Sequence, residues 1–335
     1  MQHLEMMPAC MVRQNWSFDM DDIYSVLPAD QITENEPMSA HCSFRTGGAA
    51  DLFIRVNSAD ELKAAQKCLK DEGKPMFLLG RGTNILVGDG GFRGAVVTMT
   101  ADHAGSISAA GDDRQGRIDE LCAIKADGNR IFAGAGATLA AIAASARDAA
   151  LTGLEFASGI PGSVGGGLVM NAGAYGGEMK QVVVSAKLLM SDGSTKTLSG
   201  DEMKFGYRMS VLKDNGAAAL SAVFELEPDD PETITDRMRT LAAKRREKQP
   251  LEYPSAGSTF RRPEGHFAGK LIEEAGLRGF AIGSAGVSDK HCGFVINRGS
   301  ATSAEIRAVI EAVQKRVYEN SGIRLEREVI FLGEF

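Results

Sequence analysis

Residues 159–177, GIPGSVGGGLVMNAGAYGG, contain eight glycines in nineteen positions. Glycine costs roughly 1 kcal/mol at a helical position relative to alanine, and fixing its backbone is entropically expensive anywhere. We therefore expect neither a stable helix nor a stable strand here. A chain accepts so much glycine where its backbone takes positive φ angles or approaches another group closely, typically the phosphates of a cofactor. The run predicts one wall of a site for a phosphate-bearing ligand, and a glycine-rich connection between sheets is the alternative.

Length and charge narrow the class of protein. The chain of 335 residues is long enough for two or three domains, each with its own core. Its net charge of −7 argues against nucleic acid as the main partner. The N-terminus lacks the pattern of a signal peptide, and the most apolar helical stretch, at 137–151, is too short to cross a bilayer. We expect a soluble cytoplasmic protein with no membrane partner.

The cysteines indicate a reducing compartment. The chain has five of them, an odd number, dispersed and never in CxxC spacing. This pattern fits reduced thiols and fits neither a disulfide framework nor a zinc site. We expect no metal.

Hydrophobic periodicity predicts an α+β chain. Helices are expected over 21–27, 58–73, 137–151, 232–248, 270–275 and from residue 302. Ser58 and Thr302 are the expected N-caps of two helices, each completed by a glutamate three residues later in a capping box. Strands are expected over 53–56, 75–79, 95–99, 131–133, 182–190, 195–198, 217–227, near 281 and over 294–296. A last strand at 328–332 is expected to return to an earlier sheet.

A second glycine motif, GRGTNIL at 80–86, follows an apolar strand. A Rossmann turn would need a third glycine where Ile85 stands and a helix after it, and the sequence instead continues as a strand. The segment is a strand–loop–strand turn whose amides could bind a pyrophosphate, with a tight structural turn as the alternative. A near P-loop at 265–270 lacks one spacer residue and has Leu271 at the Ser/Thr position, so an NTPase is excluded.

Several polar residues carry little information when taken singly. Arg208 in FGYRMS has the ordinary interpretation of a solvated charge, and Ser258 in SAGSTF that of a turn residue. Glu326 and Glu328 are placed on one face of the last strand, which is usually just an exposed face. No serine has the G-x-S-x-G context of a hydrolase. The pair at 291–292, His-Cys, is more often structural than metal-binding or nucleophilic.

Taken in order, nine segments resemble one family, the UDP-N-acetylenolpyruvoylglucosamine reductases. They are FRTGGAADLF, GRGTNILV, GLEFASGIPGSVGGGLVMNAGAYGGE, FGYRMS, REKQP, SAGSTF, GKLIEEAGL, VSDKHCGFVIN and LEREV. The resemblance runs from about residue 38 to the end. The glycine-rich blocks are shared with a wider group of FAD-dependent oxidases, and SAGSTF, GKLIE and the last segment narrow the resemblance to this family.

The resemblance implies an FAD-binding fold of the PCMH/VAO type in two subdomains, followed by a C-terminal α+β substrate-binding domain. The expected boundaries are an N-terminal extension at 1–36, FAD subdomain 1 at 37–100, FAD subdomain 2 at 101–227 and the substrate domain at 228–324. The strand at 325–335 would return to subdomain 1.

The implied reaction reduces the enolpyruvyl ether of UDP-N-acetylglucosamine to UDP-N-acetylmuramate in peptidoglycan synthesis. NADPH would reduce a non-covalently bound FAD, and the flavin N5 would pass hydride to the substrate. By resemblance Ser258 is the proton donor, Arg208 polarises the substrate carboxylate and Glu328 assists. A cation where negative charge develops stabilises the transition state more than the ground state. Serine can act as an acid toward a basic enolate if a cation such as Lys248 stabilises its alkoxide.

The resemblance also assigns two sets of binding residues. The expected FAD contacts are Gly80, Arg81, Gly82, Thr83, Asn84, Ile85, Leu86, Gly159, Ile160, Pro161, Gly162, Ser163, Gly165, Gly166, Asn171, Ala172 and Gly173. The expected substrate contacts are Tyr175, Lys248, Arg262, Lys270 and His291.

The chain departs from part of the family in two respects. It has no tyrosine between Tyr207 and Tyr253, so it resembles the shorter subclass that lacks an inserted tyrosine loop. Arg262 and His291 stand where many relatives have Asn and Gln. We expect a monomer.

Two other functions are weighed against the reductase. A flavin oxidase of an alcohol or sugar often tethers FAD through a histidine in the first glycine loop, and residues 80–88 contain none. A catalytically silent nucleotide-sugar-binding protein would not need Arg208, Ser258 and Glu328 together.

Overall fold

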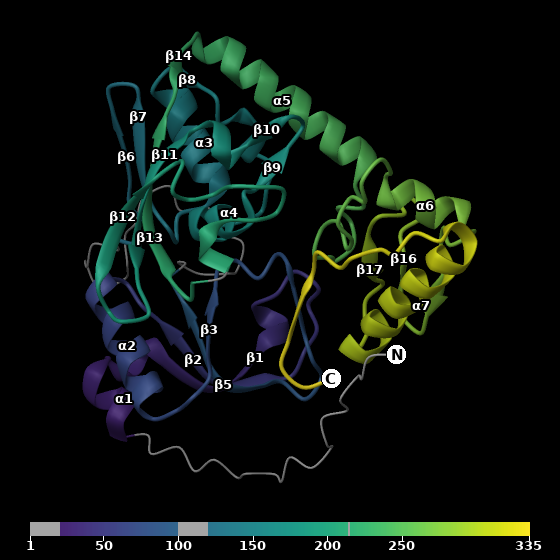
Figure 1. Cartoon of the computed structure of the whole chain (residues 1–335), viewed down its shortest axis with the longest axis horizontal. Coiled ribbons are helices and arrows are strands. Elements are labelled where there is room, and N and C mark those ends of the chain that lie inside the picture. The colour runs from purple at the N-terminus through teal and green to yellow at the C-terminus, as the bar shows by residue number, and fades with distance from the viewer. Residues whose placement is uncertain (1–20, 100–119, 214) are drawn as a thin grey trace, which may run out of the picture.

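The computed structural model describes residues 21–99, 120–213 and 215–335. Figure 1 shows two sheet-containing lobes, with α1, α2 and β1–β5 in one and β6–β13 in the other. A long helix, α5, leads from the second lobe to a C-terminal lobe that holds α6, α7, β16 and β17. The predicted extension at 1–36 lies partly outside the described residues. Within them, β1 (Ile32–Pro37) is an edge strand of the first sheet, so residue 36 falls inside a strand.

The first sheet has the order β1–β2–β5–β3. Its other strands are β2 (Ala49–Arg55), β5 (Phe92–Thr98) and β3 (Met76–Leu79), and β5 runs parallel to both neighbours. The helices of this lobe are α1 (Asp21–Val26) and α2 (Ala59–Asp71). Ser58 caps α2 as predicted, but the Glu61 carboxylate accepts from the Asn57 amide at 2.7 Å, so the predicted reciprocal box is not formed.

The second sheet is antiparallel, in the order β12–β11–β13–β7–β6. Its strands are β12 (Thr195–Ser199), β11 (Val183–Leu189), β13 (Ala218–Glu225), β7 (Arg130–Gly134) and β6 (Ile124–Asp127). The helices of this lobe are α3 (Leu139–Asp148) and α4 (Val164–Met170). Short pairs join β8 (Leu151–Thr152) to β14 (Glu227–Pro228), and β9 (Gly173–Ala174) to β10 (Gly177–Glu178).

Helix α4 corrects the expectation that no helix forms in the glycine run. Its sequence is VGGGLVM, and the Ser163 hydroxyl caps it by accepting the Gly166 amide at 3.3 Å. Two of its glycines pack tightly against residues outside the helix. A Cβ on Gly165 would lie 3.2 Å from the Ala135 Cβ and carbonyl oxygen, and one on Gly167 would lie 3.2 Å from the Met179 Cε. Tertiary packing outweighs the low helix propensity of glycine.

The C-terminal lobe begins with α5 (Pro231–Lys248), which Asp230 caps. Helix α6 (Ala268–Glu274) and helix α7 (Ser303–Ser321) follow, and α7 has the predicted reciprocal capping box between Thr302 and Glu305. A small antiparallel sheet joins β15 (Ala281–Ile282), β16 (Ala285–Val287) and β17 (Val295–Asn297). The lobe thus has its own helix-and-sheet framework.

The chain end returns to the first lobe, as the sequence predicts (Figure 1). Strand β18 (Ile330–Leu332) pairs in parallel with β4 (Ile85–Val87), in a two-stranded ladder outside the four-stranded sheet. The stretch 325–329 is not a regular strand, and its one bridge joins Phe260 to Arg327. The side chains of residues 325–329 therefore do not alternate between two faces as they would in a pleated strand.

Two hydrophobic cores share the first sheet. Leu52, Ile54 and Val97 point into the core that continues under the second sheet. Phe53 and Val96, on the alternate positions, point into the core formed with the C-terminal lobe. Because successive side chains of a strand face opposite ways, one sheet serves both cores. No helix in the described part of the chain is long and apolar enough to span a membrane.

The close packing of α4 can be tested with two valines. Gly165→Val is expected to lower the free energy of unfolding by about 1–3 kcal/mol, because the backbone of Ala135 cannot move away from the added side chain. Gly166→Val is the matched control, since a Cβ there meets only the Ser163 hydroxyl at 3.4 Å; it should change stability by less than about 0.5 kcal/mol. Urea denaturation measures both, and equal losses would contradict the packing argument.

Candidate active site

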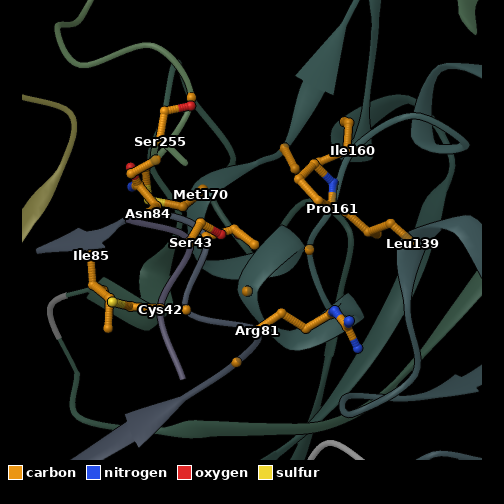
Figure 2. Close-up of a pocket in the computed structure, with 18 of the residues that line it drawn as sticks. Cys42, Ser43, Arg81, Asn84, Ile85, Leu139, Ile160, Pro161, Met170 and Ser255 are labelled. Carbon is orange, nitrogen blue, oxygen red and sulfur yellow. The ribbon is translucent and has the colours of Figure 1, made fainter. Parts of the chain in front are cut away.

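A cavity of about 1120 Å³ lies where the three lobes meet. Its size is slightly above the roughly 300–1,000 Å³ of most ligand sites, so there is room for a large cofactor and a substrate together. Figure 2 shows the opposed walls. Leu139, Ile160 and Pro161 line one side, while Cys42, Ser43, Asn84 and Ile85 line the other. The two glycine-rich segments therefore face each other across one cavity.

The first glycine turn forms one wall. Six of the residues predicted to contact FAD line the cavity, namely Gly80, Arg81, Gly82, Thr83, Asn84 and Ile85. Gly82 has φ +61°, and a Cβ there would overlap the His41 carbonyl oxygen, so only glycine fits. Leu86 points away from the cavity into the C-terminal core.

The second glycine segment forms the opposite wall. Gly159, Ile160, Pro161, Gly162, Ser163, Gly166, Ala172 and Gly173 line it. Two predicted contacts do not: Gly165 packs on Ala135, and Asn171 is a buried link. The Asn171 amide donates to the Glu178 carboxylate and to the Gly206 carbonyl, each at 3.0 Å. Asn171 thereby holds the turn that begins at residue 206 against the glycine wall.

A third wall segment, residues 39–45, was missed by the site prediction. Ser39, Ala40, His41, Cys42, Ser43 and Arg45 line the cavity. The Ser43 amide donates to the Gly82 carbonyl at 3.0 Å, so this loop supports the first glycine turn. The His41 ring is held by the Glu36 carboxylate at 2.6 Å and stacks on Phe53 at 4.0 Å. Of these residues only Arg45 lies in a family-like segment, FRTGGAADLF, and the sequence carries no comparable signal for residues 39–43.

The three predicted catalytic residues all line this cavity. The Arg208 Nε donates to the Glu328 Oε1 at 2.7 Å, joining residues 120 positions apart. Ser258 is exposed and immediately precedes the buried Thr259. The Thr259 carbonyl accepts the Glu328 amide at 2.9 Å, so the backbones that carry Ser258 and Glu328 are fixed to each other.

Arg208 sits in a strained turn. Gly206 and Met209 exchange two backbone hydrogen bonds, of 3.0 and 3.2 Å, and the intervening Arg208 has φ +54°. A positive φ is unfavourable for any residue with a Cβ, and such residues gather at functional sites. The turn presents the guanidinium to Glu328 across the cavity.

The predicted substrate residues are only partly brought together. Tyr175 lines the cavity, whereas Lys248 is exposed and does not. Arg245, one turn earlier on α5, lines the cavity instead and was missed. Its Nε donates to the Gln249 side chain at 3.0 Å, and burial lowers the pKa of its guanidinium. Gly159 lies directly against it, because a Cβ there would be 3.4 Å from the Arg245 Cδ.

The other three predicted contacts lie outside the cavity lining. The Arg262 guanidinium stacks over Phe267 at 3.9 Å, and Lys270 pairs with Glu274 at 3.6 Å. The His291 Nδ1 accepts the Gly293 amide at 3.1 Å, and its ring meets Phe294 edge-on at 4.9 Å. Burial lowers the pKa of the His291 imidazole, which favours its neutral form.

The cavity is cationic in an acidic protein. Four arginines line it, namely Arg45, Arg81, Arg208 and Arg245, against the carboxylates of Glu252 and Glu328. Because the whole chain carries −7, this local excess of positive charge indicates anionic ligands. The described residues contain no cluster of three or more His, Cys, Asp or Glu side chains that could hold a metal ion.

Two family models match this chain, each over a different region. The family model of an FAD binding domain matches residues 50–199. The family model of the UDP-N-acetylenolpyruvoylglucosamine reductase C-terminal domain matches residues 249–332. The cavity lies between these two matched regions and draws residues from both.

Proteins of the same family match this chain over nearly its whole length. The chain is 48% identical over 309 residues to the UDP-N-acetylenolpyruvoylglucosamine reductase of Agathobacter rectalis, covering 92% of this chain and 96% of that protein. It is 44% identical over 317 residues to that of Clostridioides difficile, covering 93% and 98%. The crystal structure of the reductase from Thermus caldophilus superposes with a TM-score of 0.72 at 29% identity, covering 89% of this chain and 98% of that one.

The burial of His291 predicts that the stability of the fold depends on pH. Its folded pKa is lowered, so the unfolded chain binds the proton more readily. The His291 imidazole therefore makes its full contribution to the free energy of unfolding above its ordinary pKa of about 6.5. That contribution is lost as the pH falls below this value. His291→Gln, which keeps an acceptor for Gly293, should weaken the loss of stability between about pH 7.5 and 5. Urea denaturation across that range measures the effect, with the exposed His266→Gln as control. Parallel curves for wild type and His291→Gln would refute the argument.

Proposed function

Because the chain belongs to the UDP-N-acetylenolpyruvoylglucosamine reductase family, we propose that it reduces the enolpyruvyl ether of UDP-N-acetylglucosamine to UDP-N-acetylmuramate with NADPH. The protein is an FAD-dependent oxidoreductase of peptidoglycan synthesis. The observation that carries the detailed proposal is the Arg208–Glu328 pair beside Ser258, in one cavity with two glycine walls. The nucleotide substrates suggest a cytoplasmic enzyme.

The residues present fit FAD. The two glycine walls meet at one point, since a Cβ on Gly80 would lie 2.7 Å from the Ser163 hydroxyl, and both line the cavity. A glycine backbone lets a pyrophosphate approach closely and the Arg81 guanidinium supplies positive charge, while Leu139 and Ile160 offer apolar surface to a ring system. We propose that these walls hold the cofactor. FAD, when bound, accepts hydride from NADPH and passes it to the β-carbon of the enolpyruvyl group.

Arg208 acts on the substrate carboxylate. Hydride addition at the β-carbon places negative charge on the α-carbon and its carboxylate. A guanidinium fixed there stabilises that charge more than it stabilises the ground state. The Glu328 carboxylate uses one of the five guanidinium N–H donors and leaves others for the substrate. In this proposal Glu328 orients Arg208 and moderates its charge.

Ser258 supplies the proton to the α-carbon. Its hydroxyl is accessible in the cavity, on a backbone tied to that of Glu328. A serine donates only to a strong base such as an enolate, and a cation must stabilise the alkoxide that remains. Lys248 was expected to do this, but it does not line the cavity. We propose that Arg208 and Arg245, which do, provide that stabilisation.

Two further cations are available for phosphates. Arg45 and Arg81 line the cavity on the side of the first glycine turn, and Arg245 lies opposite them against Gly159. FAD and the nucleotide substrates each carry a diphosphate, so we propose that Arg45 and Arg81 bind phosphate groups on that side of the cavity.

The first test of the function is made on purified protein. It should be yellow with bound flavin and should oxidise NADPH when the enolpyruvyl substrate or oxygen is supplied. Absorbance spectra and NADPH consumption measure this. A colourless protein that retains no flavin would overturn the proposal.

The acid role is tested by Ser258→Ala. Reduction of the flavin by NADPH should stay unchanged, and its reoxidation by substrate should slow by at least about a hundredfold, the scale of general-acid catalysis. Anaerobic stopped-flow spectroscopy separates the two half-reactions. Ser194→Ala, a remote serine in an exposed turn, is the control. If both half-reactions of Ser258→Ala match wild type, another group donates the proton.

A further inference from the structure

We propose that Tyr207 is a positioning residue, which clamps the turn that carries Arg208 onto the C-terminal lobe. The Tyr207 hydroxyl accepts a hydrogen bond from the Arg262 backbone amide at 3.0 Å. The two residues are 55 positions apart and belong to different lobes, so this bond joins two lobes. The inference rests on the proposed role of Arg208.

The Tyr207 hydroxyl binds at the end of a short ribbon of two backbone segments. Segments 259–261 and 326–328 run antiparallel, joined by the Phe260–Arg327 bridge. The Arg261 amide donates to the Glu326 carbonyl, and the Glu328 amide donates to the Thr259 carbonyl, each at 2.9 Å. Arg262 is the next residue beyond this ladder. Its amide is taken by the Tyr207 hydroxyl instead of by the opposite segment.

The turn at 206–209 is thus held to one ribbon at two neighbouring points. Tyr207 bonds the backbone of its first segment, and the Arg208 side chain bonds Glu328 of its second segment at 2.7 Å. Ser258 immediately precedes the same first segment. The ribbon therefore fixes the relative positions of all three proposed catalytic residues, and Tyr207 ties the strained turn to it.

A purely structural role does not account for Tyr207. Its ring is 55% exposed, so it contributes little to either hydrophobic core. Its one other described contact is with its own neighbour, since the Arg208 guanidinium lies 5.5 Å from the ring centroid. Both contacts act on the turn that carries Arg208. Because Arg208 has φ +54°, the turn needs external contacts to keep this conformation.

Removing the hydroxyl should therefore impair chemistry more than folding. In Tyr207→Phe the ring remains and the Arg262 amide can turn to water, while Arg208 keeps only the Glu328 anchor. Small displacements of a catalytic group reduce rate strongly. We expect reoxidation of the flavin by substrate to slow roughly threefold to tenfold, the loss of one ordinary hydrogen bond. Reduction by NADPH should stay within about twofold of wild type, because Arg208 acts on the substrate carboxylate.

A double-mutant cycle on the holoenzyme tests the proposal. Stopped-flow rates are compared for wild type, Tyr207→Phe, Arg208→Gln and the double variant, with the remote surface variant Tyr318→Phe as control. If Tyr207 acts through Arg208, adding Tyr207→Phe to Arg208→Gln should slow reoxidation less than twofold. An equal penalty in both backgrounds, or no penalty in either, would overturn it.

Failure of the wider function would look different. If the chain were not this reductase, wild type itself would not reoxidise its flavin with the enolpyruvyl substrate. If only the clamp were absent, wild type would turn over and Arg208→Gln would be slow, while Tyr207→Phe would equal wild type.

Discussion

The parallel pairing of β18 with β4 is the contact on which the site depends. It brings the chain end back beside the first glycine turn, so that Glu328, two residues before β18, faces a cavity built mainly from residues before 260. The Ile330 amide donates to the Asn84 carbonyl, and the Asn84 side chain donates to the Glu328 carbonyl. Glycines at 88 and 90 let Glu334 pass at contact distance, because a Cβ on Gly88 would overlap the Glu334 carbonyl oxygen. Without this return Arg208 would lose its carboxylate partner and the ribbon would lose one segment.

Capping residues and apolar runs in the sequence predicted those helices and strands whose limits depend on neighbouring residues in the chain. Helices α2 and α7 begin at their expected caps, Ser58 and Thr302, and the returning strand was foreseen from a short apolar run. The glycine run failed as a local argument, because α4 exists through its packing on Ala135 and Met179, which lie outside the helix. The capping box of α2 failed for a smaller reason, since the Glu61 carboxylate reaches the amide of Asn57, one residue before the cap.

The candidate site was predictable as a set of segments and not as a set of side chains. The glycine walls and the Arg208, Ser258 and Glu328 segments do meet in one cavity. Within a segment, however, direction depends on tertiary placement. Lys248 and Arg245 are three residues apart on α5, and the lobe's placement exposes the former to solvent while it aims the latter at the cavity. The same holds within the glycine run at 159–177. Some of its residues face the cavity, while others, such as Gly165 and Asn171, hold the wall together.

The shared sheet also has a consequence during synthesis. The face of the first sheet that carries Phe53 and Val96 packs against residues 256–332, the last quarter of the chain to leave the ribosome. Until then this face is covered only in part, by N-terminal residues such as Met38 and Phe44, although the opposite face can already pack with the second sheet. Nascent chains with uncovered apolar sheet faces are prone to aggregate and are substrates for chaperones. The architecture that brings residues 39–45 and 328–330 to one cavity therefore makes maturation of the N-terminal lobe wait for the last quarter of the chain.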